Sequence, residues 1–298
     1  DLPCTRLNLS NGAPVYYIND GAEEVAAIDF VFKAGNVYEN KNGVAASANY
    51  LIKNGTSKKN SFEITEYFEY YGAYLNRTCY NETATISLHC LSQHLEQLLP
   101  VIRELITDAT FPQNELEIFQ QNSIQRLSVN LLKSDFVANR LIDQYLYGVD
   151  HPYGRVSNKE DIENLNREDL QNFYKQFYLS ANCTIFSAGK LPRDFESLLE
   201  KYFGDLNLND NSPEIIFKRE MASQKKYRVS NDENGVQAAI RIARPFPNRH
   251  HPDFKKASIL NTLFGGYFGS RLMSNIREEK GYTYGISSYI QNHISDTG

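Results

Sequence analysis

The sequence has no long apolar run, no excess of basic residues and no Cys-x-x-Cys pair, and each absence argues against a class of protein. No stretch approaches the roughly 20 apolar residues that a membrane-spanning helix needs, so we expect no membrane span. With 31 Lys and Arg against 36 Asp and Glu, the formal net charge is -5, and a nucleic-acid partner is not expected. Without a Cys-x-x-Cys pair, a zinc ribbon is not expected either.

Motifs of other enzyme classes are also missing. The chain contains no Gly-x-Ser-x-Gly and no P-loop, and the glycines at 265, 266 and 269 do not follow directly on a predicted strand, as a dinucleotide-binding loop requires. The four cysteines are scattered, and we expect Cys79 and Cys90 to be buried free thiols. This usage favours a reducing compartment, and the first residues lack the pattern of a signal peptide, so we expect a cytoplasmic rather than a periplasmic location.

The histidines and carboxylates do not predict a metal site by themselves. His250 and His251 form the only close histidine pair, but neighbouring side chains diverge, and the pair lies in a proline-rich segment that we interpret as a surface loop. Glu115 and Glu117 lie in the first turn of a predicted helix, where negative charge is favourable to the helix dipole.

Polar, turn-forming residues at 206–213 divide the chain into two blocks, and the pattern of the first block begins again in the second. The strand-like run 237–244 is similar to 26–33, and the apolar helix 254–263 is similar to the helix 43–52. The period is far longer than that of a solenoid, so we interpret it as a repeat of whole domains.

We therefore predict an α+β fold with two homologous domains, each with an antiparallel-rich sheet packed against helices. The first domain is expected at residues 1–205, a linker at 206–216, and the first part of an incomplete second domain at 217–298.

The most informative stretch runs from Gly265 to Ile286. Apolar residues at helical spacing predict a helix that ends at Gly281, and the alternation after it predicts a strand. A helix that folds back on its next strand can bring Arg277 and Tyr284 together, and both side chains can donate hydrogen bonds to a carbonyl oxygen that becomes an oxyanion. Alternatively, Arg277 is a solvated charge at the helix end and Tyr284 a core aromatic.

This stretch resembles a segment of the M16 (insulinase or mitochondrial-processing-peptidase) family of metallopeptidases, which reads GG-x-x-x-S-R-L-x-x-x-L-R-E-E-x-G-x-x-Y in the second of two related domains. The resemblance implies the M16 fold, also described as LuxS/MPP-like. It also implies that Arg277 and Tyr284 form the family's R/Y pair beside the active site. The first block is similar to the family as well, at 32–35, at 43–45 and in the H-P-Y-G loop at 151–154. Asn76 lies in a segment that resembles the family's substrate-edge strand. We expect it to help hold an extended peptide, or else to be a structural Asn beside a turn.

The resemblance fails where the zinc ligands should be. Active members carry H-x-x-E-H on the helix that corresponds to 43–52, with two histidines that bind zinc and a glutamate that acts as general base. Here Ala46, Asn49 and Tyr50 stand at these positions, and the third ligand, a glutamate on the helix after Pro112, falls near Gln125 or Arg126. These side chains cannot form the site, so we expect no metal in this chain.

The resemblance therefore implies a non-catalytic subunit of a heteromeric zinc-dependent peptidase. The expected partners are a catalytic M16 subunit with an intact H-x-x-E-H, which would hold the zinc, and a peptide substrate whose transition state Arg277 and Tyr284 would support. Two alternatives stay open: a structural or assembly subunit without a peptidase role, and a zinc peptidase that uses other ligands.

Overall fold

One mixed sheet organises the first part of the protein. The computed structural model describes residues 3–179, 182–208 and 226–293. Six strands lie in the order β1-β2-β6-β3-β5-β4, in which β2 and β6 pair in parallel and the other neighbours are antiparallel. The strands are β1 (Thr5–Asn8), β2 (Pro14–Asn19), β3 (Val25–Phe32), β4 (Tyr74–Cys79), β5 (Ala84–Leu91) and β6 (Cys183–Gly189).

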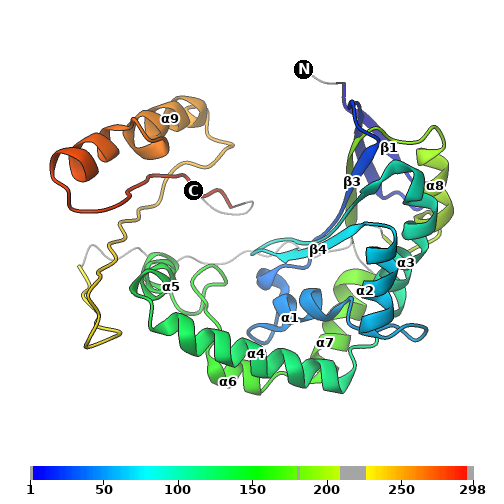
Figure 1. Ribbon diagram of the computed structural model, residues 1–298, viewed down its shortest axis with the longest axis horizontal. Coiled ribbons are helices and arrows are strands. Elements are labelled where there is room, and N and C mark those ends of the chain that lie inside the picture. Colours follow the sequence, from blue (N-terminus) through cyan, green and yellow to red (C-terminus); the bar gives the residue numbers. More distant parts are fainter. Residues whose placement is uncertain (1–2, 180–181, 209–225, 294–298) are drawn as a thin grey trace.

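Helices cover one face of this sheet, and a second group extends away from it (Figure 1). The covering helices are α1 (Val44–Leu51), α2 (Ser61–Tyr70), α3 (Leu95–Asp108), α7 (Arg167–Tyr174) and α8 (Phe195–Phe203). The group that extends outward is α4 (Gln113–Leu131), α5 (Ser134–Tyr147) and α6 (Lys159–Glu163). No helix among the described residues is long and apolar enough to cross a bilayer. Helices on one face of a mixed sheet confirm the predicted α+β class.

Alternation along the central strands fixes the two faces of the sheet. In β3 and β5 every second residue is fully buried under the helices, among them Ile28, Phe30 and Ile86, because strand side chains point to opposite faces in turn. The edge strand β4 pairs with β5, with Asn76 opposite Ser87 and Arg77 opposite Ile86. Arg77 therefore lies on the helix-covered face, whereas Asn76 lies on the open face.

The second block contains helix α9 (Phe254–Asn261), followed by π-helical turns at η4 (Thr262–Gly266) and η5 (Met273–Glu279). The predicted strands at 237–244 and 282–286 are not formed. A strand requires a hydrogen-bonded neighbour, and no described segment pairs with either run. The predicted linker is described only as far as residue 208, and its remainder lies outside the described residues.

Candidate functional site

Glu39 anchors the start of α1, the helix that stands where the family has its zinc ligands. Its buried carboxylate accepts hydrogen bonds from the backbone N–H groups of Gly43 (3.1 Å) and Ala45 (2.9 Å). Burial raises the pKa of Glu39, while the two hydrogen bonds lower it. Gly43 adopts a left-handed conformation (φ 86°), which explains a glycine at this position.

The three degenerate positions do not converge on one point. Ala46 and Tyr50, one helical turn apart, lie on the exposed side of α1, and the Tyr50 side chain is 43% exposed. Asn49 is only 2% exposed, and its amide Nδ2 donates to the Tyr178 hydroxyl (3.2 Å) and to the Thr85 carbonyl (3.4 Å). The residue at the position of the general base is therefore engaged in the core.

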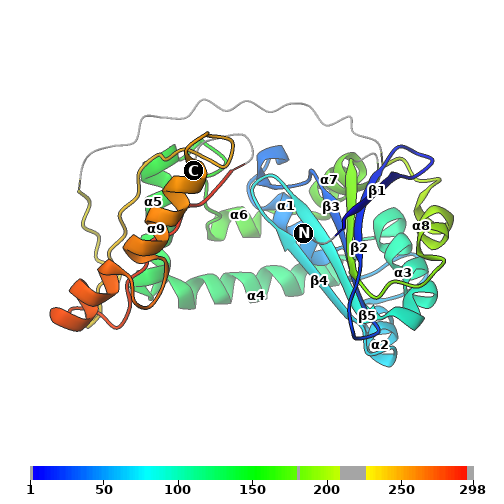
Figure 2. The ribbon, with the colours of Figure 1, turned by 90° about the horizontal axis from the view of Figure 1, so that it is seen from above.

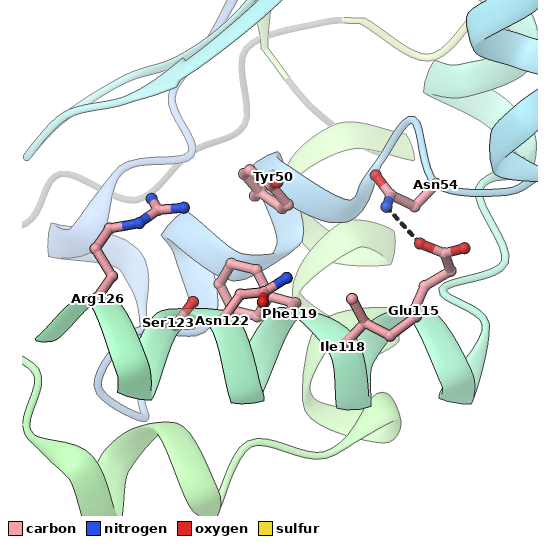
Figure 3. A pocket seen from close by; sticks show the side chains of 8 residues that line it. All are labelled: Tyr50, Asn54, Glu115, Ile118, Phe119, Asn122, Ser123 and Arg126. Atoms are coloured by element: carbon pink, nitrogen blue, oxygen red, sulfur yellow. Dashed lines mark hydrogen bonds between the residues drawn. The ribbon is translucent and has the colours of Figure 1, made fainter. Parts of the chain in front are cut away.

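Tyr50 occupies the space between α1, α4 and β4. Its ring centroid is 5.0 Å from that of Phe119 on α4, and the guanidinium carbon of Arg77 on β4 lies 5.0 Å from the Tyr50 ring centroid. Figure 3 shows Tyr50 facing α4, beside a small hollow of about 50 Å³. Aromatic and cationic side chains thus line the region around Tyr50, which is the position of the second zinc-binding histidine in the family.

Helix α4 brings a cation to this hollow instead of a carboxylate. Gln125 and Arg126 are both exposed, but only Arg126 lines the hollow, and it projects from α4 toward α1 in Figure 3. Glu115 lies at the opposite end of the hollow and accepts a hydrogen bond from Asn54 (2.7 Å). Residues 3–179, 182–208 and 226–293 contain no group of three or more His, Cys, Asp or Glu that could hold a metal ion. The side chains that are present do not fit zinc, since the positive charges of Arg77 and Arg126 would repel the ion.

The R/Y element brings Arg277 to Tyr284, but through the backbone. Arg277 Nε donates to the carbonyl oxygen of Tyr284 (3.0 Å), its guanidinium carbon lies 4.9 Å from the Phe268 ring centroid, and Nη1 is 3.5 Å from Glu278 Oε1. The Tyr284 side chain is 97% exposed. Arg277 therefore reaches the backbone of Tyr284 without the predicted strand, and the two side chains are not brought together; the phenol is left open to contact another molecule.

The R/Y element and the degenerate zinc positions on α1 lie apart in this chain. Both views place η5 at one end of the molecule and α1 near its centre (Figures 1 and 2). Asn76 is half-buried in β4, on the open face of the sheet.

Arg77 was not singled out from the sequence, although the sequence contains an indication of its unusual position. Leu75 and Cys79 share its face of β4 and pack against the core, so a charged residue between them breaks an apolar alternation. A half-buried charge with shielded, unbonded nitrogen atoms requires an explanation.

The sequence model described as Insulinase (Peptidase family M16) matches residues 14–145, and the one described as Peptidase M16 inactive domain matches residues 164–298. The chain is 24% identical over 297 residues to the "Uncharacterized zinc protease YmxG" of Bacillus subtilis, covering 98% of this chain and 71% of that protein. It is 25% identical over 288 residues to the "Non-peptidase homolog YmxG" of Helicobacter pylori, covering 95% of this chain and 65% of that protein.

The fold is similar to a solved structure over nearly the whole chain. The crystal structure of a peptidase M16 inactive domain from Pseudomonas fluorescens superposes with a TM-score of 0.83 and 24% identity, covering 99% of this chain and 73% of that chain. Together, the two sequence models account for most of both blocks. The chain therefore belongs to the M16 (insulinase) family of peptidases.

Proposed function

We propose that this chain is a non-catalytic M16 subunit that positions a peptide for cleavage by a partner subunit. The observation that carries the proposal is the state of α1: Ala46 and Tyr50 offer no zinc ligand, and Asn49 is bonded into the core. The name of the Helicobacter pylori relative, a non-peptidase homolog, supports a non-catalytic role.

Arg277 and Tyr284 are the groups proposed to act on the substrate. When a peptide carbonyl is attacked, negative charge develops on its oxygen, and fixed N–H and O–H donors stabilise that charge more than they stabilise the ground state. The exposed phenol of Tyr284 is available as a donor, and the Arg277 guanidinium is hydrogen-bonded to the backbone carbonyl of the same residue. The proposed partner is an M16 subunit with an intact H-x-x-E-H, which holds the zinc. Asn76 is proposed to hold the peptide at the edge of the sheet.

A structural or assembly subunit is the second candidate. The contacts of Arg277 with Phe268 and Glu278 favour it, because they occupy the guanidinium without any substrate. We also propose a cytoplasmic location, which suits four cysteines that are all free thiols.

Activity of the reconstituted complex separates the two candidates. We expect Arg277→Gln and Tyr284→Phe each to lower kcat roughly 100-fold with little change in KM, because each removes a donor used in the transition state. Arg271→Gln and Tyr282→Phe are matched controls, since both residues are exposed and belong to the same segment. Unchanged kcat in both test variants, with the complex intact, would favour the assembly role.

A further inference from the structure

Arg77 is a half-buried cation whose shielded nitrogen atoms have no counterion among the described residues. Its Nε and Nη1 atoms are shielded from solvent and have no hydrogen-bond partner, and no carboxylate in the described part of the chain forms an ion pair with it. The Tyr50 ring is its main neighbour. A guanidinium remains charged at neutral pH even though burial lowers the pKa of Arg77. Leaving such a group unpaired costs free energy, and a cation–π contact offsets only part of that cost.

Two further cations surround the same region. Lys53 follows α1, and its pKa is lowered first by burial and then by the charge of Arg77, so the two side chains repel one another. Arg126 approaches Tyr50 from α4 (Figure 3). The nearby carboxylates do not neutralise Arg77: Glu69 acts on Lys53, and Glu115 accepts from Asn54. The region around Tyr50, where active members of the family hold their metal, is therefore positively charged because of Arg77, Lys53 and Arg126.

The position of Arg77 on an edge strand indicates which kind of molecule could supply an anion to it. It lies on β4, the edge strand, whose outer side pairs with no described strand. An extended peptide can add to such an edge, and every second side chain of that peptide then points to the face on which Arg77 lies. A planar guanidinium matches a carboxylate in geometry and charge.

We propose that Arg77 binds a carboxylate of a peptide that pairs with β4, either an Asp or Glu side chain or the C-terminal carboxylate. This inference deepens the peptide-holding role proposed above and rests on it. The emptied metal centre then selects acidic peptides, with Arg77 as the specificity-determining residue and Lys53 and Arg126 as supporting charges.

Binding of labelled peptides to the 298-residue chain, measured by fluorescence anisotropy, tests the proposal. Three decapeptides share one extended sequence: one has a central Asp and an amidated C-terminus, one has Asn and a free C-terminus, and one has Asn and an amidated C-terminus. We expect the Asp peptide or the free-acid peptide to bind at least tenfold more tightly than the neutral peptide, since hydrogen bonds between charged groups are the stronger kind. Whichever of the two acidic peptides binds tightly identifies the source of the carboxylate.

Arg77→Gln should abolish this preference, and Arg6→Gln should keep it. Arg6 is a matched control because it lies on β1, the opposite edge strand, with its guanidinium carbon 5.4 Å from the Tyr16 ring centroid. Equal binding of all three peptides, or a preference that persists in Arg77→Gln, would overturn the carboxylate site while leaving the peptide-holding role intact. If no peptide binds, that role fails and the site fails with it.

Thermal melting gives an independent measurement. Arg77→Met should raise the melting temperature of the free chain, because it removes an unpaired, half-buried charge and keeps an apolar side chain of similar length against Tyr50. A lower melting temperature would assign Arg77 a packing role and contradict the proposal.

Discussion

At the scale of single residues, the loss of the zinc site concerns side-chain direction as much as residue type. Asn49 stands where the family has its general base, and its amide is bonded to Tyr178, a residue 129 positions later in the sequence. Its spacing from Ala46 and Tyr50 is visible in the sequence, and the helical period places Asn49 to one side of the face that the other two share. Its partner is not visible, because only the fold brings α1 and the segment after α7 together.

Asp143 on α5 provides a prediction for pH dependence. Burial raises the pKa of its carboxyl from 3.8 to about 6. The folded protein therefore binds this proton more tightly than the unfolded chain, so the contribution of Asp143 to stability falls as the pH rises from about 4 to about 6, and the full penalty remains above that range. The full shift would correspond to about 3 kcal/mol, and solvent screening of this half-buried group reduces it to about 1–2 kcal/mol.

We expect Asp143→Asn to stabilise the protein by about 1 kcal/mol at pH 7.5 and to have almost no effect at pH 4. Urea unfolding at the two pH values measures the difference, and Asp150→Asn, at an exposed position shortly after α5, is the control. A gain of equal size at both pH values would show that the carboxyl charge is not its cause.

At the scale of helices and strands, the sequence predicted the helices, which depend on local pattern, better than the strands of the second block. The helices at 43–52 and 254–263 were expected from their small or apolar residues and are formed as α1 and α9 close to those bounds, and the helix expected after Pro112 is formed as α4. The runs 237–244 and 282–286 have the alternation of strands, yet remain unpaired. Alternation indicates which residues could face a core, whereas a strand also needs a neighbour that the sequence pattern does not supply.

The relation of α1 to α4 predicts how a zinc site could be rebuilt. Ala46→His, Asn49→Glu and Tyr50→His together restore the motif on α1, but α4 still presents Arg126 to the same space. We expect this triple variant to retain little zinc after dialysis, because it has an incomplete ligand set beside a positive charge.

Adding Arg126→Glu to the triple variant should raise the bound zinc toward one equivalent, measured by elemental mass spectrometry. Gln121→Glu is the matched control, since Gln121 is exposed on the same helix and does not line the hollow. Equal zinc content in the two quadruple variants would mean that α4 does not supply a ligand from position 126.

At the scale of the whole molecule, residues 226–241 of the second block contact helix α5 of the first block. The Tyr227 ring stacks on Tyr145 with centroids 3.7 Å apart, and Arg241 contacts Asp135 and donates to Asn139 (2.6 Å). The same segment reaches the end of α4, where Asn231 donates to the Leu131 carbonyl (3.1 Å). These contacts join parts of the chain about 80–106 positions apart. They were not predicted, because the sequence pattern shows a strand-like run at 237–244 but not the partners of the segment.

The double variant Tyr227→Ala/Arg241→Ala tests whether this segment stabilises α5. A stacked aromatic pair contributes about 0.5–1.5 kcal/mol and a partly exposed ion pair about 0.2–1 kcal/mol. Their combined loss should therefore accelerate amide hydrogen exchange in α5 roughly threefold to sixtyfold. Exchange in α3, which packs against the sheet, should not change. Arg244→Ala is the control for the loss of a charge, since Arg244 is exposed three residues beyond Arg241. If α5 kept its protection in the double variant, its stability would have to come from its packing against α4 and the 151–154 loop, and the two blocks would be coupled through other residues.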